Sequence, residues 1–416
     1  MNGMAIAEPR NNLHLDTARL GCLCPDGLDA LQSFGRLLAA HGRMPKFAAV
    51  LGEGFSGLPD RIQRDFPGLR FWSGLKGLQR TIAGLVVEDP AAFVLFSAQS
   101  TSLIVFAAHV LSRRARRILC SDLEFPLVLG AIREIQAQYT GGLEILPLRR
   151  LVEEDGCDAD DLARSITGTY LRSECDALVL SQVTQHGIRI PCERIVREIR
   201  SLDPGAIIMI DGAQGVGLEL SHTVARQADI YFGVGHKWLE GSSLAFAVAP
   251  REASVGLIKA TLNDLVERYV VTDPYLRVAA HMSGLLEGRM YETISLEQLF
   301  VAAAACSVAA ARGETERAQR FDSFLDFSKT LEVVARGTGA GYRRRHPSLR
   351  TGITVIDWSE AVAAGPMELE ARLGTTGIVA TGLSEKSIRI SAPTGDFPAS
   401  AWGCLESALG SIPKGR

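Results

Sequence analysis

The sequence has no apolar run long enough to cross a membrane as a helix. Its longest apolar runs, around Ala91–Phe96 and Ile207–Ile210, have the length of β-strands, whereas a transmembrane helix needs about 20 apolar residues. Residues 1–12 also lack the basic start and apolar core of a secretory signal peptide. We therefore expect a cytoplasmic protein.

An excess of charge of one sign is absent as well. The formal net charge is −3 over 416 residues, with 47% hydrophobic and 22% charged residues. This balance is typical of a globular protein, and it offers no electrostatic attraction for nucleic acid or for a membrane surface. We expect neither as a partner.

Paired cysteines are also scarce. Of the eight cysteines only Cys22 and Cys24 are close in sequence, and a zinc site of the usual kind needs a second pair. Scattered thiols fit a reducing compartment better than a disulfide framework. The sequence therefore predicts no metal site.

The sequence does contain apolar strand-like runs that alternate with helix-like segments from about residue 80 to residue 250. Strands that are apolar throughout and alternate with helices indicate a mostly parallel sheet buried on both faces. We thus predict an α/β fold with a mostly parallel central sheet, helices on both faces, and ligands at the carboxyl ends of the strands. The strand candidates are Ala91–Ser97, Arg117–Asp122, Asp176–Val183, Ala206–Gln214, ADIYFGVG and LAFAVAP, and the helix candidates include Leu103–Arg117 and Pro126–Tyr139.

The pattern changes after the alanine-rich helix candidate Leu296–Arg312. The strand-like runs TGITVIDW, GIVATGL and KSIRISAP follow, separated by the helix candidate MELEARLG, and they predict a smaller α+β domain. The glycine-rich Gly337–Tyr342 is predicted to be a loop. The expected parts are an N-terminal arm that contributes to the small domain (1–45), a large domain (46–295) and the C-terminal small domain (296–416).

The segment IIMIDGAQGVGLEL…ADIYFGVGHKWLEG is the most informative part of the chain. Asp211 ends an apolar strand, and Lys237 follows a short strand broken by glycine. A carboxylate at the end of a buried strand is costly unless it meets a cation or hydrogen-bond donors, and the ring nitrogen of pyridoxal phosphate (PLP) is such a cation. Alone, an aspartate there is often a helix cap and a lysine is often a surface residue. Together they predict a carboxylate for the ring nitrogen and an amine for a Schiff base.

This D-G-A-Q…G-H-K segment resembles the cofactor segment of class V aminotransferase-like proteins, which include cysteine desulfurases, kynureninases and relatives of isopenicillin N epimerase. The resemblance implies PLP fold type I, with PLP in the large domain. It places Asp211 at the pyridine nitrogen, Gln214 near the phenolic oxygen, His236 near the phosphate and Lys237 as the Schiff-base and catalytic residue. Many relatives have a serine three residues before the lysine, where this chain has Val234.

Further landmarks of the family occur in the same order. FSAQSTSLIVFAA resembles the phosphate-binding turn and indicates Ser100 and Thr101, although either residue also suits an ordinary helix start. In SDLEFP, Phe125 would stack on the cofactor ring, whereas an isolated phenylalanine would be assigned to packing. In LSQVTQHGIRIP, Thr184 would face the cofactor and the substrate.

Two motifs imply contacts beyond the large domain. RMYETIS falls where many relatives have R-x-E-x-G-T, so that Thr293 would reach the phosphate bound by the partner subunit in a homodimer. The glycine of that motif is absent here. SIRIS matches the small-domain motif whose arginine holds the substrate α-carboxylate, so Arg389 is predicted to bind substrate through a bidentate contact.

The departures from the family pattern bear on the reaction. A cysteine desulfurase needs a thiolate nucleophile, but ATGLSEK, which precedes the arginine motif, contains no cysteine, and Cys404 lies beyond that motif. We therefore expect no persulfide chemistry. Phe125 favours kynureninase-like or C–S lyase-like members and a β-elimination on an amino acid or its conjugate, through an external aldimine. An aminotransferase or epimerase of a biosynthetic pathway is the alternative.

Two readings of other classes are weaker. A non-catalytic scaffold would not need Asp211 and Lys237, so their presence argues against it. A nucleotide-binding protein would need G-x-G-x-x-G after an early strand or G-K-[ST], and neither occurs.

Overall fold

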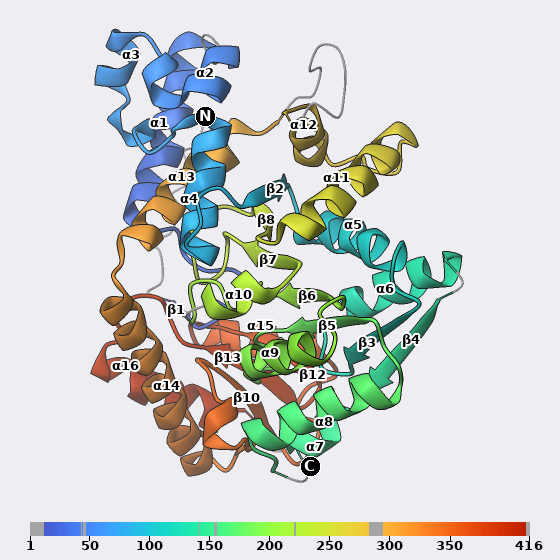
Figure 1. Cartoon of the computed structure of the whole chain (residues 1–416). Coiled ribbons are helices and arrows are strands. Elements are labelled where there is room, and N and C mark those ends of the chain that lie inside the picture. The colour runs from blue at the N-terminus through green and yellow to red at the C-terminus, as the bar shows by residue number, and fades with distance from the viewer. Residues whose placement is uncertain are drawn as a thin grey trace.

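A seven-stranded sheet forms the centre of the large domain (Figure 1). The computed structural model describes residues 12–42, 44, 47–139, 141–153, 156–219, 222–282 and 294–412. The strand order is β2-β8-β7-β6-β5-β3-β4, and every neighbouring pair is parallel except those made by β8, which is antiparallel to both β2 and β7. The strands are β2 (Phe93–Ser97), β3 (Arg117–Ser121), β4 (Gly142–Leu146), β5 (Ala177–Ser181), β6 (Ile207–Asp211), β7 (Ile230–Val234) and β8 (Ala245–Ala249).

Helices cover both faces of this sheet because successive strand residues point to opposite sides. In β5, Leu178 and Leu180 enter one hydrophobic core, whereas Ala177 and Val179 enter the other. The helices contributing to the first core include α4 (Gly74–Val87), α8 (Ala159–Arg172), α9 (Cys192–Leu202), α10 (His222–Gln227) and α13 (Leu296–Ala311). The helices of the second core are α5 (Ser100–Ser112), α6 (Pro126–Gln138), α11 (Glu252–Glu267) and α12 (Pro274–Met282).

The small domain is a four-stranded antiparallel sheet, in the order β12-β13-β10-β9, with its own hydrophobic core. Its elements are α14 (Glu314–Gly337), β9 (Gly341–Tyr342), β10 (Ile353–Asp357), α15 (Pro366–Thr375), β11 (Ile378–Val379), β12 (Thr381–Ser384), β13 (Ser387–Ser391) and α16 (Ala399–Gly410).

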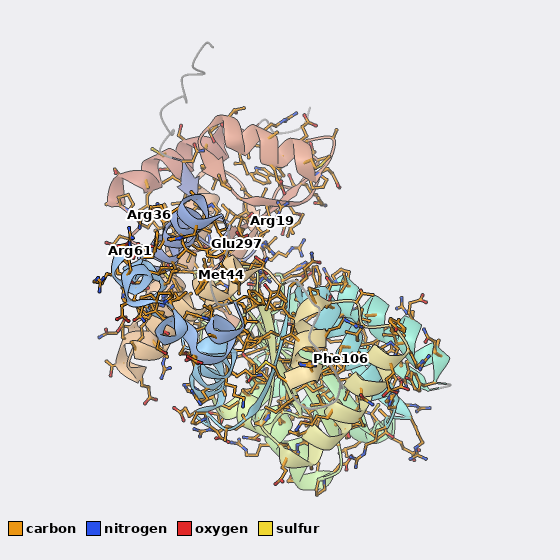
Figure 2. All side chains as sticks on the ribbon, turned by 90° about the horizontal axis from the view of Figure 1, so that it is seen from above. Arg19, Arg36, Met44, Arg61, Phe106 and Glu297 are labelled. Carbon is orange, nitrogen blue, oxygen red and sulfur yellow. The ribbon has the colours of Figure 1, made fainter. Side chains whose placement is uncertain are left out.

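The N-terminal arm contacts both domains. Its strand β1 (Leu13–His14) pairs in parallel with β11 of the small domain. The helices that follow stand beside α13 and α4 at one side of the molecule, and Arg36 and Arg61 mark this group in Figure 2. The remaining helices are α1 (Pro25–His41), α2 (Phe47–Glu53), α3 (Asp60–Asp65), α7 (Leu148–Glu153) and the 3-10 turns η1 (Gly54–Gly57), η2 (Pro67–Leu69) and η3 (Pro347–Leu349).

The predicted α/β architecture and the smaller C-terminal domain are confirmed. The structure adds that β8 runs antiparallel and that residues 47–87 are largely helical. The predicted loop Gly337–Tyr342 contains the last residue of α14 and the short strand β9. Helix α13, which begins at the predicted boundary at residue 296, packs against α1 and α4 rather than against the small domain alone. The bounds of the domains stay a prediction. No described helix is both long and apolar enough to cross a membrane.

Candidate active site

Lys237 lies in the loop after β7, at the carboxyl end of the parallel sheet. Its side chain is partly buried, and burial lowers its pKa to about 8. Asp211 opposes this shift, whereas the Arg389 guanidinium adds to it. Lys237 therefore gives up its proton more readily than a surface lysine, and its pKa responds to one carboxylate and one guanidinium.

Asp211 is the last residue of β6, the strand beside β7, so both groups end neighbouring parallel strands. Its side chain is 9% exposed, and its Oδ1 accepts a hydrogen bond of 2.8 Å from the amide of Ala213. Burial raises the pKa of Asp211, while that amide and Lys237 act against the rise. A cation placed beside Asp211 would stabilise its charged form.

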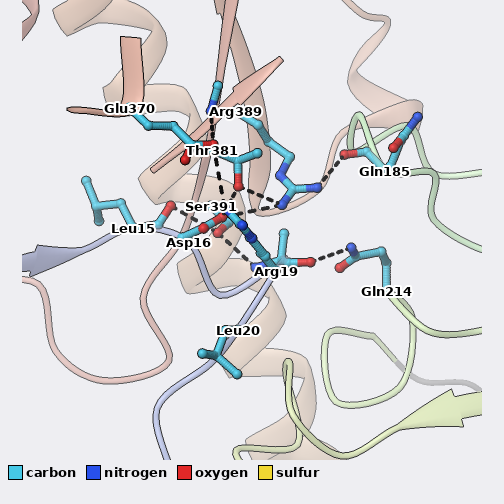
Figure 3. A network of polar contacts seen from close by, with 12 residues as sticks. Leu15, Asp16, Arg19, Leu20, Gln185, Gln214, Glu370, Thr381, Arg389 and Ser391 are labelled. Carbon is cyan, nitrogen blue, oxygen red and sulfur yellow. Dashed lines mark hydrogen bonds and ion pairs between the residues drawn. The ribbon is translucent and has the colours of Figure 1, made fainter. Parts of the chain in front are cut away.

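Gln214 is fixed by two hydrogen bonds. Its Nε2 donates to the carbonyl of Ala18 in the arm at 2.7 Å (Figure 3). Its Oε1 accepts from the indole of Trp238 at 2.9 Å. Gln214 therefore attaches the N-terminal arm to the lysine loop. One amide hydrogen remains for the phenolic oxygen to which the resemblance assigns Gln214.

Arg389 projects from β13 of the small domain towards the arm. Its Nη2 contacts Asp16 Oδ1 at 3.3 Å and the hydroxyl of Thr381 at 3.1 Å, and its Nη1 donates to the carbonyl of Gln185 at 3.4 Å (Figure 3). Its buried Nε has no hydrogen-bond partner among the described residues. Asp16 was not predicted from the sequence, since a single carboxylate in an extended arm gives no motif. It keeps the guanidinium paired and in position.

The residues predicted to bind the phosphate lie in two parts of the fold, the lysine loop and the start of α5. Burial, followed by Lys237, lowers the pKa of His236 to about 4, and its buried Nδ1 is unpartnered within the described part of the chain. Ser100 is the first residue of α5, and Thr101 follows it as an exposed residue. The amides of a helix's first turn have no partners inside the helix, so they offer donors to an anion.

Phe125 and Thr184 have different environments. Phe125 is 45% exposed at the start of α6, which leaves ring surface for stacking. Thr184 is buried, and its hydroxyl accepts a 3.1 Å hydrogen bond from the amide of Ile188. That bond gives Thr184 a role in closing the loop. Thr293 lies outside the described residues.

Glu124 is a buried carboxyl near Asp211 that the sequence did not reveal. It is 2% exposed and accepts hydrogen bonds from Ser121 at 2.7 Å and from Ser181 at 2.5 Å. Burial raises its pKa to about 7, and the Asp211 charge adds to the rise. The sequence did not predict the burial of Glu124, because a glutamate between two apolar runs is usually a surface residue.

The chemical types of these groups match the parts of PLP. The buried His236 Nδ1 and the first turn of α5 supply donors for a dianion, Asp211 supplies a carboxylate for a ring nitrogen, and Lys237 supplies an amine of lowered pKa. The unpartnered Arg389 Nε leaves one donor for a carboxylate.

Comparison with known proteins gives the fold. No family model matches the chain. A "Probable cysteine desulfurase" of Vibrio cholerae is 30% identical over 102 residues, which cover 22% of this chain and 25% of that relative. The structure of a cystine C–S lyase in complex with cysteine persulfide has a TM-score of 0.68 at 14% identity, covering 97% of this chain and 98% of that one. A cysteine desulfurase from Escherichia coli has a TM-score of 0.66 at 15% identity, covering 96% and 94%. The chain has the cysteine desulfurase-like structure of PLP fold type I.

Within the cysteine desulfurase-like fold, the candidate residues occupy the expected edge of the sheet. Asp211 ends β6, Lys237 lies in the loop after β7, and Ser100 begins the helix after β2. Ligands of open α/β sheets bind at the carboxyl ends of the strands. The role of each residue is therefore proposed below on the basis of its surroundings.

Proposed function

We propose that this protein is a PLP-dependent enzyme that acts on an amino acid or an amino-acid conjugate. The observation that carries the proposal is the electrostatic influence of Asp211 and Arg389 on Lys237, which follows the strand beside the one that Asp211 ends. Asp211 and Arg389 both act on the Lys237 amine, whose pKa is lowered to about 8. A lysine of lowered pKa beside a buried carboxylate, at the edge of the sheet where ligands bind, supports a catalytic site.

Three residues and one helix start would bind the parts of PLP. Lys237 would hold PLP through its amine, and Asp211 would keep a proton on the ring nitrogen. His236 and the first turn of α5, with Ser100 and Thr101, would bind the phosphate. Bound PLP supplies an electron sink for the bond that breaks at the substrate's α carbon.

Substrate would be oriented from the small domain. Arg389 would donate from Nε to the substrate carboxylate while Asp16 holds the other side of its guanidinium. Released as a free amine, Lys237 would take the proton from the α carbon, and a pKa near 8 suits this exchange at neutral pH.

For the reaction itself we propose elimination at the β carbon, as in a C–S lyase. The fold is shared with a cystine C–S lyase, and Phe125, an accessible aromatic side chain, would take the stacking position. A persulfide-forming desulfurase is disfavoured because β12 and the turn to β13 contain no cysteine. Of the described cysteines only Cys22 and Cys404 are exposed, in the arm and in α16.

The first experiment records absorbance between ~320 and ~450 nm, where protein-bound pyridoxal absorbs. Wild type incubated with PLP should show a visible band that borohydride removes. Lys237→Ala should lose this band, and the surface variant Lys259→Ala should keep it. A colourless wild type, or a band retained in Lys237→Ala, would overturn the assignment and favour a scaffold protein.

A second experiment identifies the products formed from S-substituted cysteines. A lyase releases a keto acid, ammonia and a thiol, and should do so equally in Cys22→Ser. Amino transfer to an added keto acid would instead indicate an aminotransferase, and inversion at the α carbon without release would indicate an epimerase. Sulfur transfer lost in Cys22→Ser would show a desulfurase and contradict the proposed reaction.

A further inference from the structure

Glu124 is a buried carboxyl to which the proposed function assigns no role. It lies in the turn between β3 and α6, directly before Phe125, and it is 2% exposed. Glutamate is almost never buried to this extent unless it is paired, because its charged form loses the surrounding water. No described lysine, arginine or histidine forms an ion pair with Glu124. Neutral groups therefore hold this carboxyl in the fold.

Two serines hold the Glu124 carboxyl at the ends of neighbouring strands. Ser121, the last residue of β3, donates to Oε1 at 2.7 Å, and Ser181, the last residue of β5, donates to Oε2 at 2.5 Å. The Ser121 hydroxyl also accepts a hydrogen bond of 3.3 Å from the amide of Leu123, which closes the turn. Glu124 is thus fixed at the carboxyl end of the sheet, where ligands bind.

Ser181 brings Glu124 close to Asp211. Ser181 and Asp211 are register partners on the parallel strands β5 and β6, which places their Cα atoms about 4.8 Å apart. Their side chains leave the sheet on the same face, because Val179 and Met209, two residues earlier on each strand, both belong to the second core. The side chain that donates to Glu124 therefore lies beside the side chain of Asp211.

The surroundings of the two carboxyls favour a charge on Asp211 rather than on Glu124. Asp211 accepts a hydrogen bond from the amide of Ala213, and Lys237 also stabilises its charged form. Burial raises the pKa of Glu124 to about 7, the two serine hydroxyls oppose the rise, and the Asp211 charge adds to it. Below about pH 7, Glu124 therefore holds a proton.

The other titratable groups that interact with Glu124 are thiols. Cys120 lies on β3, and Cys192 is the first residue of α9. Burial raises the pKa of both thiols, and the charge of Glu124 contributes to each rise. Both thiols are therefore neutral near pH 7. Asp211 remains as the charged group to which the Glu124 carboxyl responds.

We propose that Glu124 is a positioning residue that links cofactor binding to pH through Asp211. It holds a proton while the site is empty and releases it when the cationic ring of PLP lies against Asp211. The inference rests on the proposed PLP function.

The link follows from the charges. A cation at Asp211 offsets the charge that helps to keep Glu124 protonated, so the carboxyl O–H bond breaks and the proton passes to the buffer. By reciprocity, a charged Glu124 increases the affinity for a cationic ring. The contribution of Glu124 to affinity should therefore grow as pH rises through about 7.

Fluorescence titration with 4′-deoxypyridoxine 5′-phosphate tests the link, because this probe has the ring nitrogen and the phosphate of PLP but no aldehyde to react with Lys237. Wild type and Glu124→Gln should bind it nearly equally at about pH 6, where the wild-type carboxyl is mostly neutral. At about pH 8.5, Glu124→Gln should bind it about tenfold more weakly, which corresponds to a change of about 1 pH unit in the Glu124 midpoint. Weaker binding by the same factor at both pH values would show a merely structural role and overturn the proposal.

Glu144→Gln is the matched control for this titration. It removes a carboxyl from the partly buried strand β4, on the far side of β3 from β5. It should bind the probe as wild type does at both pH values. A loss at about pH 8.5 equal to that of Glu124→Gln would mean that net charge, and not the place of Glu124, is the cause.

Carbon NMR of protein labelled at the glutamate side-chain carboxyls follows the proton itself, with the Glu124 signal assigned by its loss in Glu124→Gln. Its midpoint should lie near 7 without ligand. It should fall by about 1 pH unit in wild type with the probe bound, and also in Asp211→Asn, which removes a nearby like charge. An unchanged midpoint in Asp211→Asn, or in probe-bound wild type, would overturn the proposal.

The two measurements separate this inference from the proposed function. If wild type binds neither the probe nor PLP while Asp211→Asn still lowers the Glu124 midpoint, the PLP function fails, and the link fails with it, although the two carboxyls interact. If wild type binds PLP and the midpoint does not respond, the PLP function stands and only the role of Glu124 is wrong.

Discussion

Glu124 shows how a single buried side chain connects stability with pH. Its pKa is about 7 in the folded protein, above the ordinary value of 4.5, so between these values the folded state binds more protons than the unfolded state. Stability therefore falls as pH rises from about 4.5 to about 7. The shift corresponds to a cost of at most about 3 kcal/mol above pH 7, at 1.36 kcal/mol per pKa unit.

We predict that Glu124→Gln raises the free energy of unfolding at pH 8 relative to wild type, and changes it little at pH 5, where the wild-type carboxyl is already neutral. Urea denaturation at the two pH values measures the difference. Glu144→Gln, on the partly buried strand β4, serves as the control. An equal effect of Glu124→Gln at both pH values would show that its charge is not the cause.

At the scale of elements, the close approach of the arm to the lysine loop depends on Gly21. Its amide donates to the carbonyl of His236 at 2.7 Å, and a Cβ there would lie 2.3 Å from the carbonyl oxygen of Lys237. We predict that Gly21→Ala displaces this loop and raises the PLP dissociation constant about tenfold, equivalent to roughly 1.4 kcal/mol. Fluorescence titration with PLP measures the change.

Gly35→Ala is the matched control for this prediction. Gly35 lies inside α1, and a Cβ there meets no atom within 4 Å. The substitution should leave PLP affinity unchanged and stabilise the helix by roughly 0.5–1 kcal/mol. Unchanged PLP affinity in Gly21→Ala would mean that the loop tolerates the displacement.

The sequence predicted the positions of the strands better than it predicted their directions or the contacts between residues far apart in the chain. Mostly apolar runs located the ends of β5, β6 and β7 within one to three residues. Parallel and antiparallel strands buried on both faces share this pattern, so the direction of β8 was not predicted. The Asp211–Lys237 pair was found because both residues sit at strand ends with a known motif. Asp16 and Glu124 were missed because their importance arises from contacts with Arg389 and Ser181, far away in the sequence.

For the whole molecule, the arm is the connection between the two domains near the site. It pairs with β11 through β1, and Asp16 meets Arg389 of β13 with both side chains less than a tenth exposed. Removing one partner of a buried pair leaves the other uncompensated and costs about 3–5 kcal/mol. We predict that Asp16→Ala lowers the free energy of unfolding by about 3 kcal/mol, and that Asp16→Asn lowers it less because an acceptor oxygen remains.

Chemical denaturation of Asp16→Ala, compared with Arg19→Ala, tests this coupling. Arg19 belongs to the same arm, but its contact with Glu370 is 3.5 Å long and exposed, so its loss should cost less than about 1 kcal/mol. Similar losses in the two variants would show that burial of the Asp16–Arg389 pair adds nothing to stability.

The pairing of β1 with β11 also has a consequence for synthesis on the ribosome. Leu13 pairs with Ile378, so Leu13 has no partner strand until the 365 residues from 14 to 378 have been made (378 − 13). At about 5–20 residues per second, the arm would stay without its partner strand for roughly 20–70 s, while the large domain folds behind it. Asp16 can reach Arg389 only after β13 has been made, whereas Gly21 can contact the lysine loop as soon as residues 236–240 have emerged. The contacts of the arm with the small domain therefore form late in synthesis. A chain cut short before β11 would contain the lysine loop but neither the partner strand of the arm nor Arg389.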